Sequence, residues 1–158
     1  MGEYAISYFN PAYPSETRSI TINATSMQCY NRVDDQGSRY LLGDYKGKLY
    51  ILVLKLADLQ APSTSSQASR PLQVADLRLE CLGTTSIPEA IVYLDNDHVF
   101  VGSHFGDSQL VLLHTDADQH GEYLEVMETF TNVAPLTDFE VVDLEGQGQV
   151  NSLAYRII

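Results

Sequence analysis

A pattern of residues occurs twice in this chain, and this repeat constrains the fold more than any other feature. Residues 40–47 (YLLGDYKG) align with residues 99–106 (VFVGSHFG), and both copies run into an aliphatic stretch that ends at Leu54 or Leu113. A polar, Ser-rich stretch at 58–71 lies between them. Without that stretch the offset between the copies is roughly 40–50 residues, which is typical of one four-stranded β-propeller blade.

The segments around these copies alternate between apolar and polar residues or form short aliphatic runs, as β-strands do. Only Glu122–Thr129 also shows helical spacing of its large side chains, and its flanking strands and turns favour a strand. The expected strands lie at residues 1–10, 20–22, 27–30, 40–42, 49–54, 72–82, 91–94, 99–101, 109–113, 122–130 and 138–144.

Within each copy, we expect the apolar run before the first glycine to be an inner strand that is buried on both faces. The two glycines of each copy would allow the backbone to turn sharply. A third copy is incomplete, because Val141–Leu144 resembles an inner strand but the chain soon reaches Ile157-Ile158. The sequence therefore predicts an all-β fold, a partial β-propeller of about two to three four-stranded blades. A β-sandwich is the competing arrangement.

Two to three blades are fewer than a closed propeller requires, so edge strands would remain open at both ends. Open edges pair readily with another chain. The sequence is thus compatible with a piece of a larger assembly, or with a propeller-like protein that is completed by homo-oligomerisation through its open edge strands.

The chain is acidic, with a formal charge of −12 from 21 acidic and 9 basic residues. Binding to nucleic acid requires clustered cations that displace phosphate counterions. The densest cationic stretch, at 39–55, is interpreted instead as the exposed face of a hairpin. We therefore expect no direct nucleic acid binding. No apolar run has the length of a membrane span, and the first residues do not indicate secretion.

No arrangement of residues in the sequence indicates catalysis, a metal or a cofactor. Cys29 and Cys81 lie in separate strand-like runs, and the 4 histidines lack the spacing of zinc sites. We expect two reduced thiols, buried or half-buried. The acidic residues near Asp34, Asp95 and Asp116 fall at turns, where Asp accepts hydrogen bonds from backbone amides. The sequence therefore predicts a protein that is not an enzyme and needs no cofactor.

Several ungapped segments between Cys29 and Asp143 occur in the same order in one known family. They lie at residues 31–33, 37–44, 76–78, 85–87, 93–96, 99–103, 106–111 and 127–132. Together they resemble the later blades of the first propeller in the DNA damage-binding protein 1 family. The resemblance divides the chain into an N-terminal segment, 1–28, with one or two strands and a poor match, and a partial propeller, 29–158, with a flexible loop at 58–71.

The resemblance implies a non-catalytic scaffold for protein–protein interactions. Members of this family are three-propeller adaptors of cullin–RING ubiquitin ligases, whose first and third propellers hold substrate receptors while the second docks on the cullin. They also take part in the recognition of UV-damaged DNA for nucleotide excision repair, where a partner subunit contacts the DNA. By resemblance, this chain would bind substrate-receptor proteins in the nucleus and cytoplasm, and would meet the cullin only through parts that lie outside it.

The resemblance also implies receptor contacts on the rim loops of the first propeller. The matching positions are Glu89, His104, Phe105, Pro135 and Leu136. His104 and Phe105 stand where the family has an Arg-Leu pair. At each of these positions, the plainer interpretation is an ordinary residue of a turn between strands.

Overall fold

The computed structural model describes residues 4–11, 14, 17–23, 26–56, 74–134, 136–141 and 153–156. Throughout these ranges the regular elements are β-strands. None of the described residues belongs to a helix long and apolar enough to cross a membrane. The predicted Ser-rich loop at 58–71 lies outside the described residues.

The strands follow one another closely along the described part of the chain. Their bounds are β1 Tyr4–Tyr8, β2 Arg18–Ile22, β3 Met27–Arg32, β4 Arg39–Asp44, β5 Lys48–Leu56, β6 Val74–Thr84, β7 Pro88–Tyr93, β8 His98–Ser103, β9 Ser108–Leu113, β10 Leu124–Phe130, β11 Asp138–Val141 and β12 Leu153–Arg156. The segment with helical spacing, Glu122–Thr129, contains most of β10, so the prediction of a strand there is confirmed.

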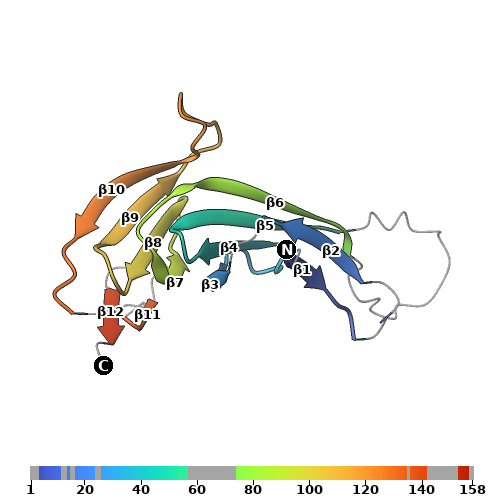
Figure 1. Cartoon of the computed structure of the whole chain (residues 1–158), viewed down its shortest axis with the longest axis horizontal. Coiled ribbons are helices and arrows are strands. Elements are labelled where there is room, and N and C mark those ends of the chain that lie inside the picture. Colours follow the sequence, from blue (N-terminus) through green and yellow to red (C-terminus); the bar gives the residue numbers. More distant parts are fainter. Residues whose placement is uncertain are drawn as a thin grey trace.

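Two antiparallel sheets of four strands each form the body of the structure (Figure 1). The first has the order β3-β4-β5-β6 and the second the order β7-β8-β9-β10, so every strand pairs with its neighbour in the chain. β1 pairs with β2, and β11 pairs with β12. A four-stranded meander of this kind is a propeller blade. The predicted all-β propeller fold is confirmed, with two complete blades.

The two complete blades pack face to face. β3 and β4 both contact β7, so the first strands of the two blades lie side by side. The interface between the blades is a cluster of buried apolar side chains: Leu41, Leu49, Leu82, Ile91, Val99, Val101, Val111 and Leu124. Removing this cluster from water is the hydrophobic contribution that holds one blade against the next.

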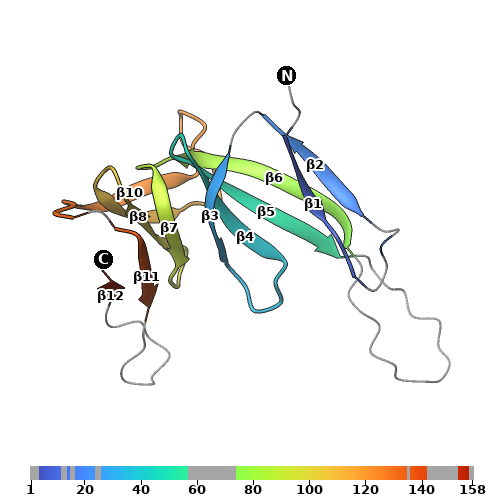
Figure 2. The same cartoon turned by 60° about the horizontal axis from the view of Figure 1, so that its bottom comes forward.

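The two-stranded sheets lie against the remaining faces of this pair (Figure 2). β2 lies beside β6, and Ile6 and Ile20 pack against a cluster that contains Leu52. β11 lies beside β7, and Leu136 packs with Phe100 just before β11 begins. β1 and β2 therefore resemble the outer half of a preceding blade, and β11 and β12 resemble the inner half of a following one. The predicted division of the chain at residue 28 stays a prediction.

The first glycine of each repeat copy does not form a turn, and that prediction is wrong. Gly43 lies inside β4 and Gly102 inside β8. A Cβ added at Gly43 would collide with Cγ of Pro88 and would lie 2.9 Å from Cδ1 of Ile91. Gly43 is therefore needed because β7 of the second blade approaches β4 so closely. Gly47, in contrast, lies in a turn with a left-handed backbone at φ +83°.

The apolar runs before these glycines lie in β4 and β8, which are the second strands of the two blades and have a neighbouring strand on each side. β8 is buried along nearly its whole length, as expected of a strand covered on both faces. β4 alternates between half-buried and buried positions before its buried end at Gly43 and Asp44.

Candidate protein-docking rim

Four connecting segments lie at the same end of the two blades, and we call them the rim. They comprise residues 45–47 between β4 and β5, 85–87 between β6 and β7, 104–107 between β8 and β9, and 131–134, the first part of the connection from β10 to β11. An antiparallel meander returns to the same end after every second strand, which brings these segments together.

Hydrogen bonds join the rim segments of the two blades. The N–H of Thr85 donates to the carbonyl of Gly47 at 2.7 Å. The N–H of Ser86 donates to Oε1 of Gln109, at the start of β9, at 2.8 Å. The connection between the blades is therefore bonded to the turn between β4 and β5 and to the first residues of β9, and the rim is continuous from one blade to the next.

The turn between β4 and β5 is organised by one buried carboxylate. Oδ1 of Asp44 accepts hydrogen bonds from the N–H groups of Lys46 at 2.9 Å and Lys48 at 2.8 Å. The hydroxyl of Tyr50 donates to Oδ2 at 3.3 Å. Burial, together with the charge of Asp44, raises the pKa of Tyr50 to about 12. This turn is stabilised by residues close in sequence, as Asp at the start of a turn predicts.

The turn between β8 and β9 is organised by residues from distant segments. Oγ of Ser103 donates to the carbonyl of Ile87 at 2.8 Å and accepts from the N–H of Gly106 at 3.0 Å. The side-chain amide of Asn132 donates to the carbonyl of Ser103 at 2.9 Å. The rim connections on both sides of the second blade therefore meet at this turn.

Each rim segment exposes one large apolar side chain. They are Tyr45, Ile87, Phe105 and Val133, with exposed fractions of 43%, 42%, 83% and 90%. The ammonium group of Lys46 lies 5.3 Å from the centre of the Tyr45 ring. Exposed apolar side chains that gather on one surface are typical of sites that bind other proteins, and these four share the rim end of the blades. Sequence reasoning missed Tyr45, Ile87 and Val133, although their positions between strands were a usable signal.

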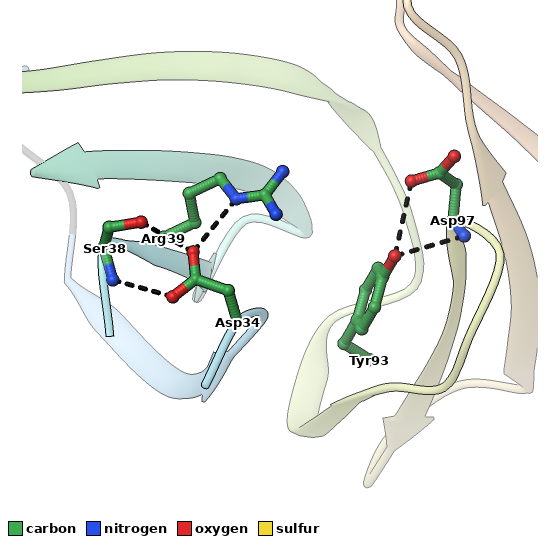
Figure 3. A network of polar contacts seen from close by, with 5 residues as sticks. All are labelled: Asp34, Ser38, Arg39, Tyr93 and Asp97. Atoms are coloured by element: carbon green, nitrogen blue, oxygen red, sulfur yellow. Dashed lines mark hydrogen bonds and ion pairs between the residues drawn. The ribbon is translucent and has the colours of Figure 1, made fainter. Parts of the chain in front are cut away.

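The opposite end of the blades carries polar turns stabilised within themselves (Figure 3). The carboxylate of Asp34 accepts from the N–H of Ser38 at 2.8 Å and pairs with the guanidinium of Arg39 at 3.0 Å. The hydroxyl of Tyr93 donates to the carboxylate of Asp97 at 3.3 Å and accepts from its N–H at 3.2 Å. The prediction that Asp side chains accept from backbone amides at these turns is confirmed for Asp34 and for Asp95, which accepts from the N–H of Asn96 at 2.8 Å. The carboxylate of Asp97 instead accepts from a tyrosine hydroxyl, and this end offers a polar surface.

Comparison with known proteins identifies the fold family. Residues 1–131 match the sequence model described as the RSE1/DDB1/CPSF1 first beta-propeller. The chain belongs to this family. DNA damage-binding protein 1 of Oryza sativa subsp. japonica is 47% identical over 149 residues, and that of Solanum lycopersicum is 44% identical over 149 residues. DNA damage-binding protein 1a of Arabidopsis thaliana is also 44% identical.

These alignments cover 94% of the chain but only 12% of each relative. The chain therefore corresponds to a small part of the curated relatives that it matches. Membership of the RSE1/DDB1/CPSF1 first-propeller family explains the regular order of the sheets, because consecutive blades of one propeller pack face to face around a common axis. The match begins at residue 1, so β1 and β2 lie within it.

The structure brings three of the five residues expected to bind receptors to one end of the second blade. Phe105 and His104 lie in the turn between β8 and β9, with their ring centres 4.6 Å apart and the rings inclined at 69°. Glu89 is exposed near the start of β7, at an irregularity in the pairing with β8. Because Pro88 pairs with Ser103, Glu89 lies at the same end of the blade as this turn.

Of the other two expected residues, one is buried and one lies outside the described residues. Leu136 is 7% exposed and packs with Phe100, so its side chain belongs to the interior. Pro135 lies outside the described residues. In this family member, the exposed neighbour of Leu136 on the rim is Val133.

In the part of the chain that the structure describes, the thiols and acidic residues show no arrangement suited to a metal. Among the described residues, no three His, Cys, Asp or Glu side chains are placed to hold an ion together. Cys29 is half-buried, and burial together with the charge of Glu89 raises its pKa to about 12. Cys81 is exposed, which corrects the expectation that both thiols are at least half-buried.

Proposed function

We propose that this chain is a non-catalytic scaffold and that its rim docks a substrate-receptor protein of a cullin–RING ubiquitin ligase. The observation that supports this best is the row of exposed apolar side chains, one on each rim segment. The name DNA damage-binding protein 1 belongs to relatives at 44–47% identity, and by resemblance this chain takes part in UV-damaged-DNA recognition for nucleotide excision repair. It would act in the nucleus and cytoplasm.

The charge of the chain supports a division of labour with its partners. A net charge of −12 opposes contact with phosphates, so a partner subunit would contact the DNA. The cullin would be bound by parts of the adaptor that lie outside this chain. The receptor would meet Glu89, His104 and Phe105 and, by resemblance, Pro135. Leu136 would support this surface from the interior, because it is buried against Phe100.

The proposal is tested by removing exposed rim side chains one at a time. Phe105→Ser and Val133→Ser leave the core untouched, since both side chains project into solvent. We expect each to weaken binding to a helical segment of a substrate receptor on the order of tenfold, as for anchors of an interface. Binding is measured by fluorescence anisotropy of the labelled segment.

Met127→Ser is the matched control, because Met127 is 51% exposed but lies on the outer strand β10, away from the rim. It should leave the affinity unchanged. Equal affinities for Phe105→Ser, Val133→Ser and the unsubstituted chain would refute docking at the rim.

A second candidate is self-association through open edge strands, and an apolar groove beside β1 favours it. In the described part of the chain, β1 pairs only with β2. A groove of about 230 Å³ beside it is lined by apolar side chains of β1, β4, β5 and β6, including Tyr8, Leu42 and Leu54. A second copy would then add strands there. Light scattering behind a sizing column distinguishes the two candidates, because only self-association yields a discrete oligomer without a receptor.

A further inference from the structure

The two rim turns align in the repeat but are stabilised in different ways. Asp44 of the first copy corresponds to Ser103 of the second. The carboxylate of Asp44 reaches two N–H groups of its own turn. The shorter hydroxyl of Ser103 reaches only one, that of Gly106, at 3.0 Å. The turn between β8 and β9 is also bridged by the N–H of Ser103, which donates to Oγ of Ser108 at 3.3 Å. In the first turn, by contrast, the N–H groups of Lys46, Gly47 and Lys48 all donate to Asp44, so the second turn has fewer bonds among its own residues.

Asn132 supplies the support that this turn lacks. Its Nδ2 donates to the carbonyl of Ser103 at 2.9 Å and to the carbonyl of Gly106 at 3.1 Å, and lies 3.5 Å from the carbonyl of His104. In addition, the N–H of Asn132 donates to Oδ1 of Asp107 at 3.0 Å. The residue thus bonds to the turn on both sides of Phe105, the most exposed aromatic side chain of the rim.

The chemistry of these contacts suits the amide at position 132. The acceptors around Nδ2 are carbonyl oxygens, so a group with at least two N–H bonds can satisfy more than one of them. An Asp side chain of the same shape would place acceptors against acceptors. In the first blade, the corresponding connection bonds through Thr85, whose N–H and hydroxyl both reach one carbonyl, that of Gly47. The contact between a side-chain amide and the turn is therefore found in the second blade and not at the corresponding connection of the first.

We propose that Asn132 is a positioning residue, whose side-chain amide holds the turn between β8 and β9 in the conformation that presents Phe105 on the rim. A turn held in this way does not lose conformational freedom when a partner binds, which raises affinity. This inference rests on the proposed function for its biological role. The local effect of Asn132 on the turn is independent of any partner.

The chain contains no Trp, so a single introduced Trp reports on one site. Phe105→Trp places this reporter on an exposed position of the turn. Time-resolved anisotropy is then compared between Phe105→Trp alone and Phe105→Trp with Asn132→Asp. In the variant that also carries Asn132→Asp, we expect a smaller amplitude of the slow component of the anisotropy decay. The reason is that the indole then moves with a turn that is no longer held by the amide. Amide exchange at Gly106 should also become about tenfold faster, as expected for lost hydrogen bonds.

Asn96→Asp is the matched control, because Asn96 lies in the turn at the opposite end of the same blade and the charge change is identical. It should leave the anisotropy at position 105 unchanged. Asn132→Ala, which removes the amide without adding charge, should reproduce the effect of Asn132→Asp in a chain that remains folded, as urea unfolding verifies.

Two results would overturn the proposal. One is equal anisotropy with and without the Asn132 amide, which would show that the turn is held by its other bonds. The other is global unfolding of both Asn132 variants, which would place the residue's role in the whole sheet. Neither the anisotropy nor the amide exchange measurement involves a receptor. A failure of receptor docking at the rim would therefore leave these two results unchanged, and the two proposals can fail independently.

Discussion

Substitution of Gly43 by Ala tests how closely the two blades approach each other. The glycine lies in β4 where β3 and β7 converge. The added methyl group would collide with the buried ring of Pro88, and would lie 2.9 Å from Ile91 and 3.1 Å from Sγ of Cys29. All three neighbours are side chains of the packed interior, so the blades must separate or repack.

Overpacking of this kind costs about 1–3 kcal/mol, and the ring of Pro88 cannot rotate away, so we expect a value near the upper end. For a domain of this size, the loss corresponds to a fall in melting temperature of roughly 4–10 °C. Urea unfolding followed by circular dichroism measures the change in the free energy of unfolding. Thermal melts provide the second estimate.

Gly106→Ala is the control for a glycine with space around it. Its nearest non-neighbouring atom to an added Cβ is Oγ of Ser103 at 3.4 Å, which is an ordinary contact. This variant should change the free energy of unfolding by less than about 0.5 kcal/mol. If Gly43→Ala were as stable as Gly106→Ala, the blades would not be in close contact at Gly43 and the described packing would be refuted.

Two further predictions concern titration and reactivity. Burial opposes ionisation of Asp34, but hydrogen bonds from Ser38 and Arg39 outweigh it and lower the pKa of Asp34 from 3.8 to about 2. The stability that ionised Asp34 contributes is therefore present above about pH 4 and lost as the pH falls towards 2. In Asp34→Asn, the urea midpoint should consequently fall less steeply between pH 4 and pH 2 than in the unsubstituted chain. An equally steep fall in both chains would contradict the network. Iodoacetamide should alkylate Cys81, which is exposed in the folded chain, and should spare Cys29, whose pKa is raised to about 12. Mass spectrometry measures the labelling of each thiol, and equal labelling of the two would contradict this prediction.

The strands and self-contained turns could be predicted from the sequence because their determinants are local. Alternating and aliphatic runs gave the positions of strands such as β5 and β9. Asp34 and Asp44 stabilise turns through N–H groups no more than four residues away. The repeat predicted that strands would form units of four, since one such unit recurs with the same turn between its central strands.

The candidate site was less predictable, because a short segment does not reveal which of its side chains will be covered. Phe105 and Leu136 were both expected on the interaction surface, but only Phe105 is exposed. Leu136 turns towards Phe100 because β11 lies beside β7. Cys81 was expected to be at least half-buried, but it is exposed. Whether a side chain of β6 is covered depends on which other elements pack against that strand, and a local pattern does not reveal this.

The sequence by itself determined that this chain is an all-β, acidic member of a propeller family, because hydrophobic periodicity, charge and ungapped motifs are properties of the linear chain. Tertiary structure alone decided the role of Gly43, whose lack of a side chain matters only because Pro88 of the next blade lies against it. It also decided the role of Asn132, which bonds to carbonyls of a turn 26 to 29 residues away. Contacts between residues so distant in sequence arise only when whole sheets pack, and no local pattern encodes them.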